Sequence, residues 1–156
     1  SNLLGHSIVA CNGDNMPPKG SFEAIFKHES AMLAYDSAKL GLPDDRTSAF
    51  AVVSMDDCGA LKRIVEKPTP EVASKFVGDD GVLRVSMNTF RLPYLDFMKI
   101  AMECPMNEER GEKELPTAIQ QYVDANPGKI KAILFAGEFL DLTHPEDFEF
   151  VMNKLQ

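Results

Sequence analysis

Apolar residues along the chain alternate between the two-residue period of β-strands and the longer period of α-helices. Short apolar runs typical of strands occupy residues 6–11, 31–35, 49–55, 60–65, 82–92 and 130–135. Residues 94–102, 115–123 and 148–155 instead place apolar side chains at helical spacing, and we expect all three stripes to face a core. Because strands and helices interleave throughout, the pattern predicts a single α/β domain.

Residues with turn and cap chemistry lie between these segments. Asp56 to Gly59 separate two of the β-rich runs and predict a hairpin. Ser21 is expected to cap a short helix, and Thr69 to cap a second one. Thr143 to Glu146 has the pattern of a capping box before the last helix.

Composition and charge exclude several classes of protein. With 156 residues, 44% hydrophobic and 26% charged, the chain can bury a core and is not intrinsically disordered. A net charge of −8 excludes nucleic-acid binding through a basic face. No apolar run approaches the roughly 20 residues of a membrane helix, so no membrane partner is expected. Three widely spaced cysteines without a C-x-x-C pair favour free thiols and a cytoplasmic location.

Two aspartates follow apolar runs that are expected to be strands. Asp14 comes after residues 7–11, and Asp141 lies near the end of residues 137–142. Ligands of open α/β sheets bind at the carboxyl ends of strands. Either aspartate alone is typical of a turn or a helix cap. As a pair they could share one Mg²⁺, because Mg²⁺ is usually held by one or two carboxylates together with phosphates and water.

Glu66 and Lys67 end the second strand of the predicted hairpin, directly before Pro68. The proline is expected to direct Lys67 into extended backbone. A carboxylate there could accept hydrogen bonds from sugar hydroxyls, and an ammonium could neutralise a phosphate. From these residues alone, the alternative interpretation, an exposed Glu–Lys pair before a turn that contributes little, is favoured.

Five segments in a fixed order resemble those of a known family. They are Asn12-Gly13-Asp14-Asn15, Val65-Glu66-Lys67-Pro68, Val85-Ser86-Met87-Asn88, Gly111-Glu112-Lys113-Glu114-Leu115-Pro116, and the stretch from Phe139 to Asp147. The set resembles the sugar-phosphate nucleotidyltransferases, also called NDP-sugar pyrophosphorylases. The resemblance implies a three-layer, doubly wound mixed sheet, the nucleotide-diphospho-sugar transferase (GT-A-like) fold.

The resemblance also implies an activity and the residues that perform it. Members join a nucleoside triphosphate (NTP) to a sugar 1-phosphate, giving an NDP-sugar and pyrophosphate. The sugar-phosphate oxygen attacks the α-phosphorus in line, so no protein nucleophile is required.

By this resemblance, Asp14 and Asp141 bind Mg²⁺, and together with Lys67 they form the catalytic set. Glu66 binds the sugar, Lys67 contacts the sugar phosphate, and Gly13 and Asn88 complete the substrate pocket. The sequence around Asn88 reads Ser-Met-Asn-Thr, which departs from the family's commoner Asn-Ala-Gly.

The glycine-rich loop that binds the triphosphate in this family has no counterpart in the chain, which contains neither Gly-Gly nor Gly-x-Gly. We therefore expect residues 1–156 to be one partial domain, the C-terminal portion of an N-terminally truncated catalytic domain. Such a portion should be inactive alone. It should also self-associate through an exposed sheet edge.

Two other functions remain open from the sequence. One is a metal-dependent glycosyltransferase on a similar scaffold, although its usual Asp-x-Asp triplet does not occur in this chain. The other is a non-catalytic module of the same fold that binds sugar nucleotides or a protein. Mg²⁺-dependent binding of a sugar 1-phosphate that is lost in Asp14→Ala would distinguish an active-site half from an interaction module.

Overall fold

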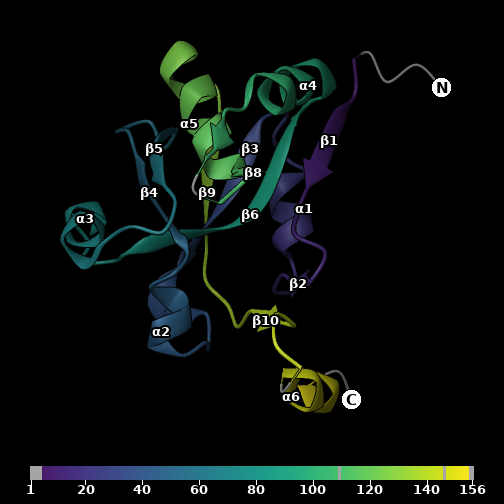
Figure 1. The fold of residues 1–156 in the computed structure, drawn as a ribbon, viewed down its shortest axis with the longest axis vertical. Helices are drawn as coiled ribbons and strands as arrows, with labels where there is room; N and C mark the ends of the chain where they lie inside the picture. The colour runs from purple at the N-terminus through teal and green to yellow at the C-terminus, as the bar shows by residue number, and fades with distance from the viewer. Residues whose placement is uncertain (1–4, 109, 146, 155–156) are drawn as a thin grey trace.

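A six-stranded mixed sheet forms the centre of the computed structural model, which describes residues 5–108, 110–145 and 147–154 (Figure 1). Its strands are β1 (Ser7–Ala10), β3 (Ala31–Asp36), β4 (Ala51–Met55), β5 (Leu61–Val65), β6 (Arg84–Pro93) and β9 (Lys131–Phe135). Two shorter pairs join β2 (Asn15–Met16) to β10 (Leu140–Asp141), and β7 (Met106–Asn107) to β8 (Glu112–Lys113). The strands predicted from the apolar runs are therefore confirmed.

The helices are α1 (Ser21–Ile25), α2 (Asp44–Thr47), α3 (Pro70–Ala73), α4 (Tyr94–Glu103), α5 (Leu115–Ala125) and α6 (Asp147–Lys154), with 3₁₀ turns at Ser37–Lys39 and Ser74–Phe76. Over the described ranges, every helix is too short or too polar to cross a bilayer.

The strand order is β5-β4-β6-β3-β9, and β1 pairs with β6 as well. Strand β9 runs parallel to β3, whereas β1, β3 and β4 are all antiparallel to β6. The predicted hairpin is the antiparallel pair β4–β5. The long strand β6 therefore has β3 along one side, while β4 and β1 share its other side.

Alternate side chains of the sheet point into two separate cores. Met32, Phe90 and Ile119 belong to the core between the sheet and helices α4 and α5. Ile25, Tyr35 and Phe139 belong to the core on the opposite face, which α1 helps to cover. Because both faces of the sheet are covered, the molecule has the predicted three layers.

The apolar stripes of two helices are less buried than predicted. The stripe of α5 packs into the core as expected, with Ile119 fully buried. In α4 only Ile100 is buried, and Met102 is 74% exposed. In α6 only Val151 is buried, and Phe148 is 63% exposed. Helix α6 lies beyond β10, away from the main sheet (Figure 1), so there is little surface against which its stripe could pack.

The predicted caps have mixed outcomes. Thr69 does cap α3, because its hydroxyl accepts a hydrogen bond from the Val72 amide at 3.4 Å. The prediction for Ser21 is wrong: Gly20, with φ of 89°, occupies the cap position. Ser21 is instead the first helical residue, and its hydroxyl donates to the Pro18 carbonyl at 2.6 Å. Glu146 of the predicted capping box lies outside the described residues.

Strand β6 contains a bulge at its centre. Opposite β3, it advances from Phe90 to Ser86 while β3 advances only from Met32 to Ala34. The extra residues include Asn88, whose φ is 54°. Bulges bend a strand and redirect its side chains, and they are frequent beside active sites.

Candidate functional site

A polar cleft opens at this bulge, where β6 exchanges one neighbouring strand for another. Strand β4 begins opposite Ser86, and β1 ends opposite Phe90. Strand β5 ends beside the start of β4, because Val65 pairs with Val52. The segments that follow β1 and β5 therefore emerge at the same place and surround a cleft of about 210 Å³.

The cleft brings together five of the six predicted site residues, which are Asp14, Glu66, Lys67, Asn88 and Asp141. It is also lined by Asn12, Asn15, Ala49, Phe50, Ala51, Ser86, Met87 and Thr143. Gly13 is the exception, because it does not line the cleft and a Cβ added to it would have no atom within 4 Å. The structure thus gives no steric reason for a glycine at that position.

The short pair β2–β10 holds the two predicted metal-binding aspartates side by side. Asp141 pairs with Asn15, and the Leu142 amide donates to the Asp14 carbonyl at 3.0 Å. Asp14 is exposed, whereas Asp141 is only 6% exposed. Two aspartates that are far apart in sequence therefore line one cleft.

Asp141 is held in place by neighbours on both of its oxygens. The amide and the hydroxyl of Thr143 donate to Oδ1 at 3.0 and 2.5 Å. The Arg46 guanidinium lies 3.8 Å from Oδ2 and donates from Nη2 to both carboxylate oxygens of Asp147 at 2.9 Å. Hydrogen bonding by Arg46 lowers the pKa of Asp147 below its usual value. The sequence analysis missed Arg46, because nothing in the polar stretch 41–46 distinguishes it from an ordinary surface charge.

Lys67 and Asn88 are, within the described residues, the two non-glycine positions with positive φ, at 42° and 54°. The prediction of extended backbone at Lys67 is therefore wrong. Pro68 disfavours the right-handed helical region at the preceding residue, and the chain meets that restriction with a sharp bend between β5 and α3. Such conformations cost about 1–3 kcal/mol each and concentrate at functional sites.

Two groups in the cleft suit a polyhydroxylated ligand. Burial raises the pKa of Glu66, and the neighbouring charge of Glu114 raises it further. The Asn88 side-chain oxygen is buried and has no hydrogen-bond partner among the residues that the structure describes. A buried acceptor without a partner is unfavourable, so a ligand hydroxyl that donates to it would be bound favourably.

The donor set of the cleft fits a hard divalent cation that is also bound to phosphate. Within the described ranges, no cluster of three or more His, Cys, Asp or Glu side chains could hold a metal alone. Asp14 and Asp141 offer two carboxylates, and Mg²⁺ commonly combines one or two carboxylates with substrate phosphates and water. These two aspartates are therefore the residues that would hold the ion.

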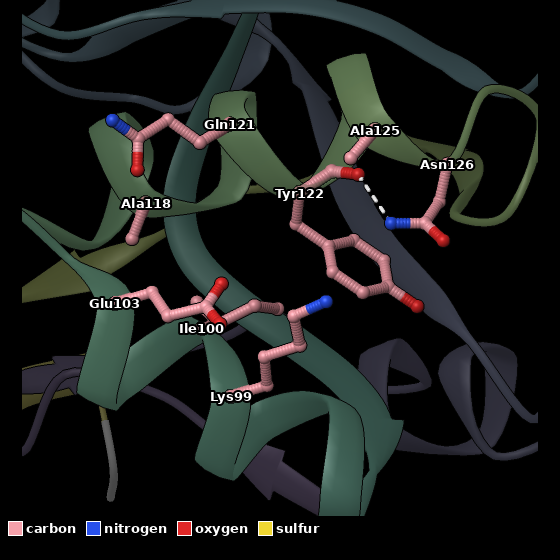
Figure 2. Close-up of a pocket in the computed structure, with 8 residues that line it drawn as sticks. All are labelled: Lys99, Ile100, Glu103, Ala118, Gln121, Tyr122, Ala125 and Asn126. Atoms are coloured by element: carbon pink, nitrogen blue, oxygen red, sulfur yellow. Dashed lines mark hydrogen bonds between the residues drawn. The ribbon is translucent and has the colours of Figure 1, made fainter.

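A second hollow lies between α4 and α5 and does not have these properties (Figure 2). Its volume is about 50 Å³, which is room for only a few water molecules. The hydroxyl of Tyr122, which lines it, already donates to Asp96 at 2.7 Å. Asn126, on the same wall, donates to the Tyr122 carbonyl at 2.9 Å (Figure 2). We assign no ligand to this hollow.

Comparison with solved structures places the fold. One neighbour is a Bacillus anthracis protein assigned as a glucose-1-phosphate thymidylyltransferase, in complex with sucrose, with TM-score 0.62 and 18% identity over 97% of this chain. Another is a nucleoside-diphosphate-sugar pyrophosphorylase from Vibrio cholerae, with TM-score 0.58 and 15% identity over 94% of this chain. A third is HddC from Yersinia pseudotuberculosis, with TM-score 0.53 and 17% identity over 96% of this chain.

The chain has the fold of the NDP-sugar pyrophosphorylases. It spans 55–56% of the length of these neighbours. No protein-family profile and no curated protein sequence matches the chain. The likeness to the pyrophosphorylase fold therefore rests on structure, and it agrees with the fold implied by the five sequence segments.

Proposed function

We propose that the chain supplies the metal-binding and sugar-phosphate-binding side of a sugar-1-phosphate nucleotidyltransferase site. The reaction would convert an NTP and a sugar 1-phosphate to an NDP-sugar and pyrophosphate. One observation supports this most strongly: residues from four of the five family-like segments, including both aspartates, line a single cleft. An exposed Glu–Lys pair with a purely structural role would not require two aspartates and Asn88 in the same cleft.

Each side chain in the cleft has a role that suits this chemistry. Lys67 would bind the phosphate of the sugar 1-phosphate as a point charge. Glu66 and the unpartnered oxygen of Asn88 would accept hydrogen bonds from the sugar hydroxyls. Asp14 and Asp141 would hold Mg²⁺, which neutralises charge on reacting phosphates. Catalysis would then consist of positioning and charge neutralisation, without a protein nucleophile.

The triphosphate side of the reaction has no equivalent loop in this sequence, which lacks Gly-Gly and Gly-x-Gly. Backbone N–H groups of glycine-rich loops are what cradle phosphates in many nucleotide sites. We therefore propose that the 156-residue chain binds the sugar 1-phosphate side but does not turn over alone. We also propose that it self-associates through an unpaired sheet edge.

Equilibrium binding distinguishes the proposed active-site portion from a non-catalytic interaction module. Calorimetric titration with glucose 1-phosphate, with and without Mg²⁺, should show Mg²⁺-dependent binding by the wild-type chain. Asp14→Ala and Lys67→Ala should each weaken binding by at least about tenfold, since each removes a charged contact. Asp79→Ala, an exposed aspartate outside the cleft, is the matched control and should have no effect. Binding that survives Asp14→Ala unchanged would favour the interaction module.

A further inference from the structure

Arg46 lies behind the cleft rather than in its wall. It is not among the lining residues, although its guanidinium lies 3.8 Å from the lining residue Asp141. Its side chain is 20% exposed, and those of Asp141 and Asp147 are 5% and 15% exposed. A residue in this position acts on a ligand through Asp141, so any role in the site is a positioning role.

The guanidinium is shared between two carboxylates from consecutive elements. Asp141 ends β10, and Asp147 begins α6. Arg46 donates from Nη2 to both oxygens of Asp147 at 2.9 Å, whereas Nη1 faces Asp141 Oδ2 at the longer distance of 3.8 Å. Of these two carboxylates, Asp147 therefore has the closer contact with the guanidinium, and Asp141 has the longer one.

A divalent cation bound to Asp141 would lie close to the positive charge of the Arg46 guanidinium. Thr143 already donates twice to Oδ1, so Oδ2, the oxygen that Arg46 faces, is the one with fewer hydrogen bonds. A cation bound to either oxygen of Asp141 would be repelled by the nearby guanidinium. The negative charge of a phosphate bound at the same time would offset that repulsion.

We propose that Arg46 is a built-in counter-ion for Asp141, which keeps the affinity for a free divalent cation low and so favours the cation that arrives with phosphate. Asp147 tunes this effect by drawing the guanidinium away from Asp141. The inference rests on the proposed metal site at Asp14 and Asp141. It adds a residue that would make occupancy by the cation depend on the sugar phosphate.

Mn²⁺ binding, followed by electron paramagnetic resonance of the free ion, tests the proposal without any turnover. The full chain is titrated with Mn²⁺ alone and with Mn²⁺ plus glucose 1-phosphate. Arg46→Met removes the counter-ion and should tighten binding of Mn²⁺ alone on the order of tenfold, the Coulomb effect of one charge on a divalent ion about 6 Å away in a water-like dielectric. Addition of glucose 1-phosphate should then increase the Mn²⁺ affinity of the wild-type chain by a larger factor than that of Arg46→Met.

Asp147→Asn should have the opposite effect and weaken Mn²⁺ binding, because it removes a negative charge that competes with Asp141 for the guanidinium. Arg46→Lys keeps the charge and should leave the affinity within about threefold of wild type. Opposite signs for Arg46→Met and Asp147→Asn distinguish an electrostatic role from a structural one, since disruption of the Arg46–Asp147 contact would affect both variants alike. Circular dichroism establishes that each variant is folded.

Asp14→Asn distinguishes failure of the proposed metal site from failure of the proposed role of Arg46. If the wild-type chain binds Mn²⁺ and Asp14→Asn does not reduce that binding, the proposed metal site itself is wrong. If Asp14→Asn abolishes binding but Arg46→Met leaves it unchanged or weaker, the metal site stands and the counter-ion role of Arg46 is overturned. Should Arg46→Met fail to fold, tighter binding by Asp147→Asn would overturn the role equally.

Discussion

Several residues of the cleft are unfavourable for folding by themselves. Lys67 and Asn88 have positive φ, Asp141 is a nearly buried carboxylate, and Glu66 is an acid whose pKa is raised by burial. Stability alone would favour glycine at the first two positions and neutral side chains at the others. Their concentration around one cleft is what a binding site requires, because binding needs groups that are not already satisfied.

Glu66→Gln should stabilise the chain at neutral pH. A carboxyl whose pKa is raised on folding stabilises the native state below its unfolded value near 4.5, and this stabilisation is lost as the pH rises through the folded pKa. The glutamine variant cannot ionise, so it does not suffer the loss. We expect its melting temperature to exceed that of wild type by a few degrees at pH 7, with the difference vanishing near pH 4. Differential scanning calorimetry of both proteins at pH 7 and at pH 4 measures the difference in melting temperature.

Glu71→Gln is the matched control, because it removes the same formal charge from an exposed glutamate. A hydrogen bond with Thr69 lowers the pKa of Glu71, so its ionised form stabilises the native state above the unfolded value and this contribution is lost in acid. This variant should not gain stability at pH 7. An equal gain by both variants would mean that relief of net negative charge, rather than the environment of Glu66, is responsible.

At the scale of elements, regular patterns were readable from the sequence and long-range pairings were not. The hairpin β4–β5 is local, and the stripe of α5 matches a single helix face, so both follow from residue spacing. The pair β2–β10 has two residues in each strand and joins distant parts of the chain. Helices α4 and α6 each present more apolar side chains than the neighbouring elements bury. The spacing of apolar residues shows that a helix has an apolar face, but not how much of that face another element covers.

Strand β1 is the element on which the proposed self-association depends. In the described part of the chain it pairs only with β6, and its four residues are half-buried. Neighbouring helix α4 exposes Leu95 and Met102 at 59% and 74%. Unpaired strand edges are templates for pairing with another chain. We expect concentration-dependent dimers in sedimentation equilibrium, and Val9→Pro at this edge should reduce them.

Leu134→Lys provides a control at another exposed position, because Leu134 is 54% exposed on the outer strand β9. This substitution should leave the association constant unchanged if β1 is the contact. A wild-type chain that sediments as a monomer at all accessible concentrations would argue against self-association. Equal loss of dimer in both variants would place the contact elsewhere.

At the scale of the whole molecule, the fold explains how the candidate site is assembled. Strand β6 changes neighbours at its bulge, and the ends of β1, β5 and β10 all reach that point. The order of five short segments in the sequence was enough to predict that Asp14, Glu66, Lys67, Asn88 and Asp141 would gather there. Arg46 could not be found in this way, because its importance follows only from its distance to Asp141.

The central claim is that Asp14 and Asp141 share one divalent cation beside Glu66 and Lys67. The most direct measurement is an anomalous difference map from crystals of the chain grown with Mn²⁺ and glucose 1-phosphate. We predict one strong peak between the two carboxylates, with the sugar phosphate on its other side. A map in which Mn²⁺ binds only elsewhere, for example at the exposed Asp79 and Asp80, with no density between Asp14 and Asp141, would contradict the account.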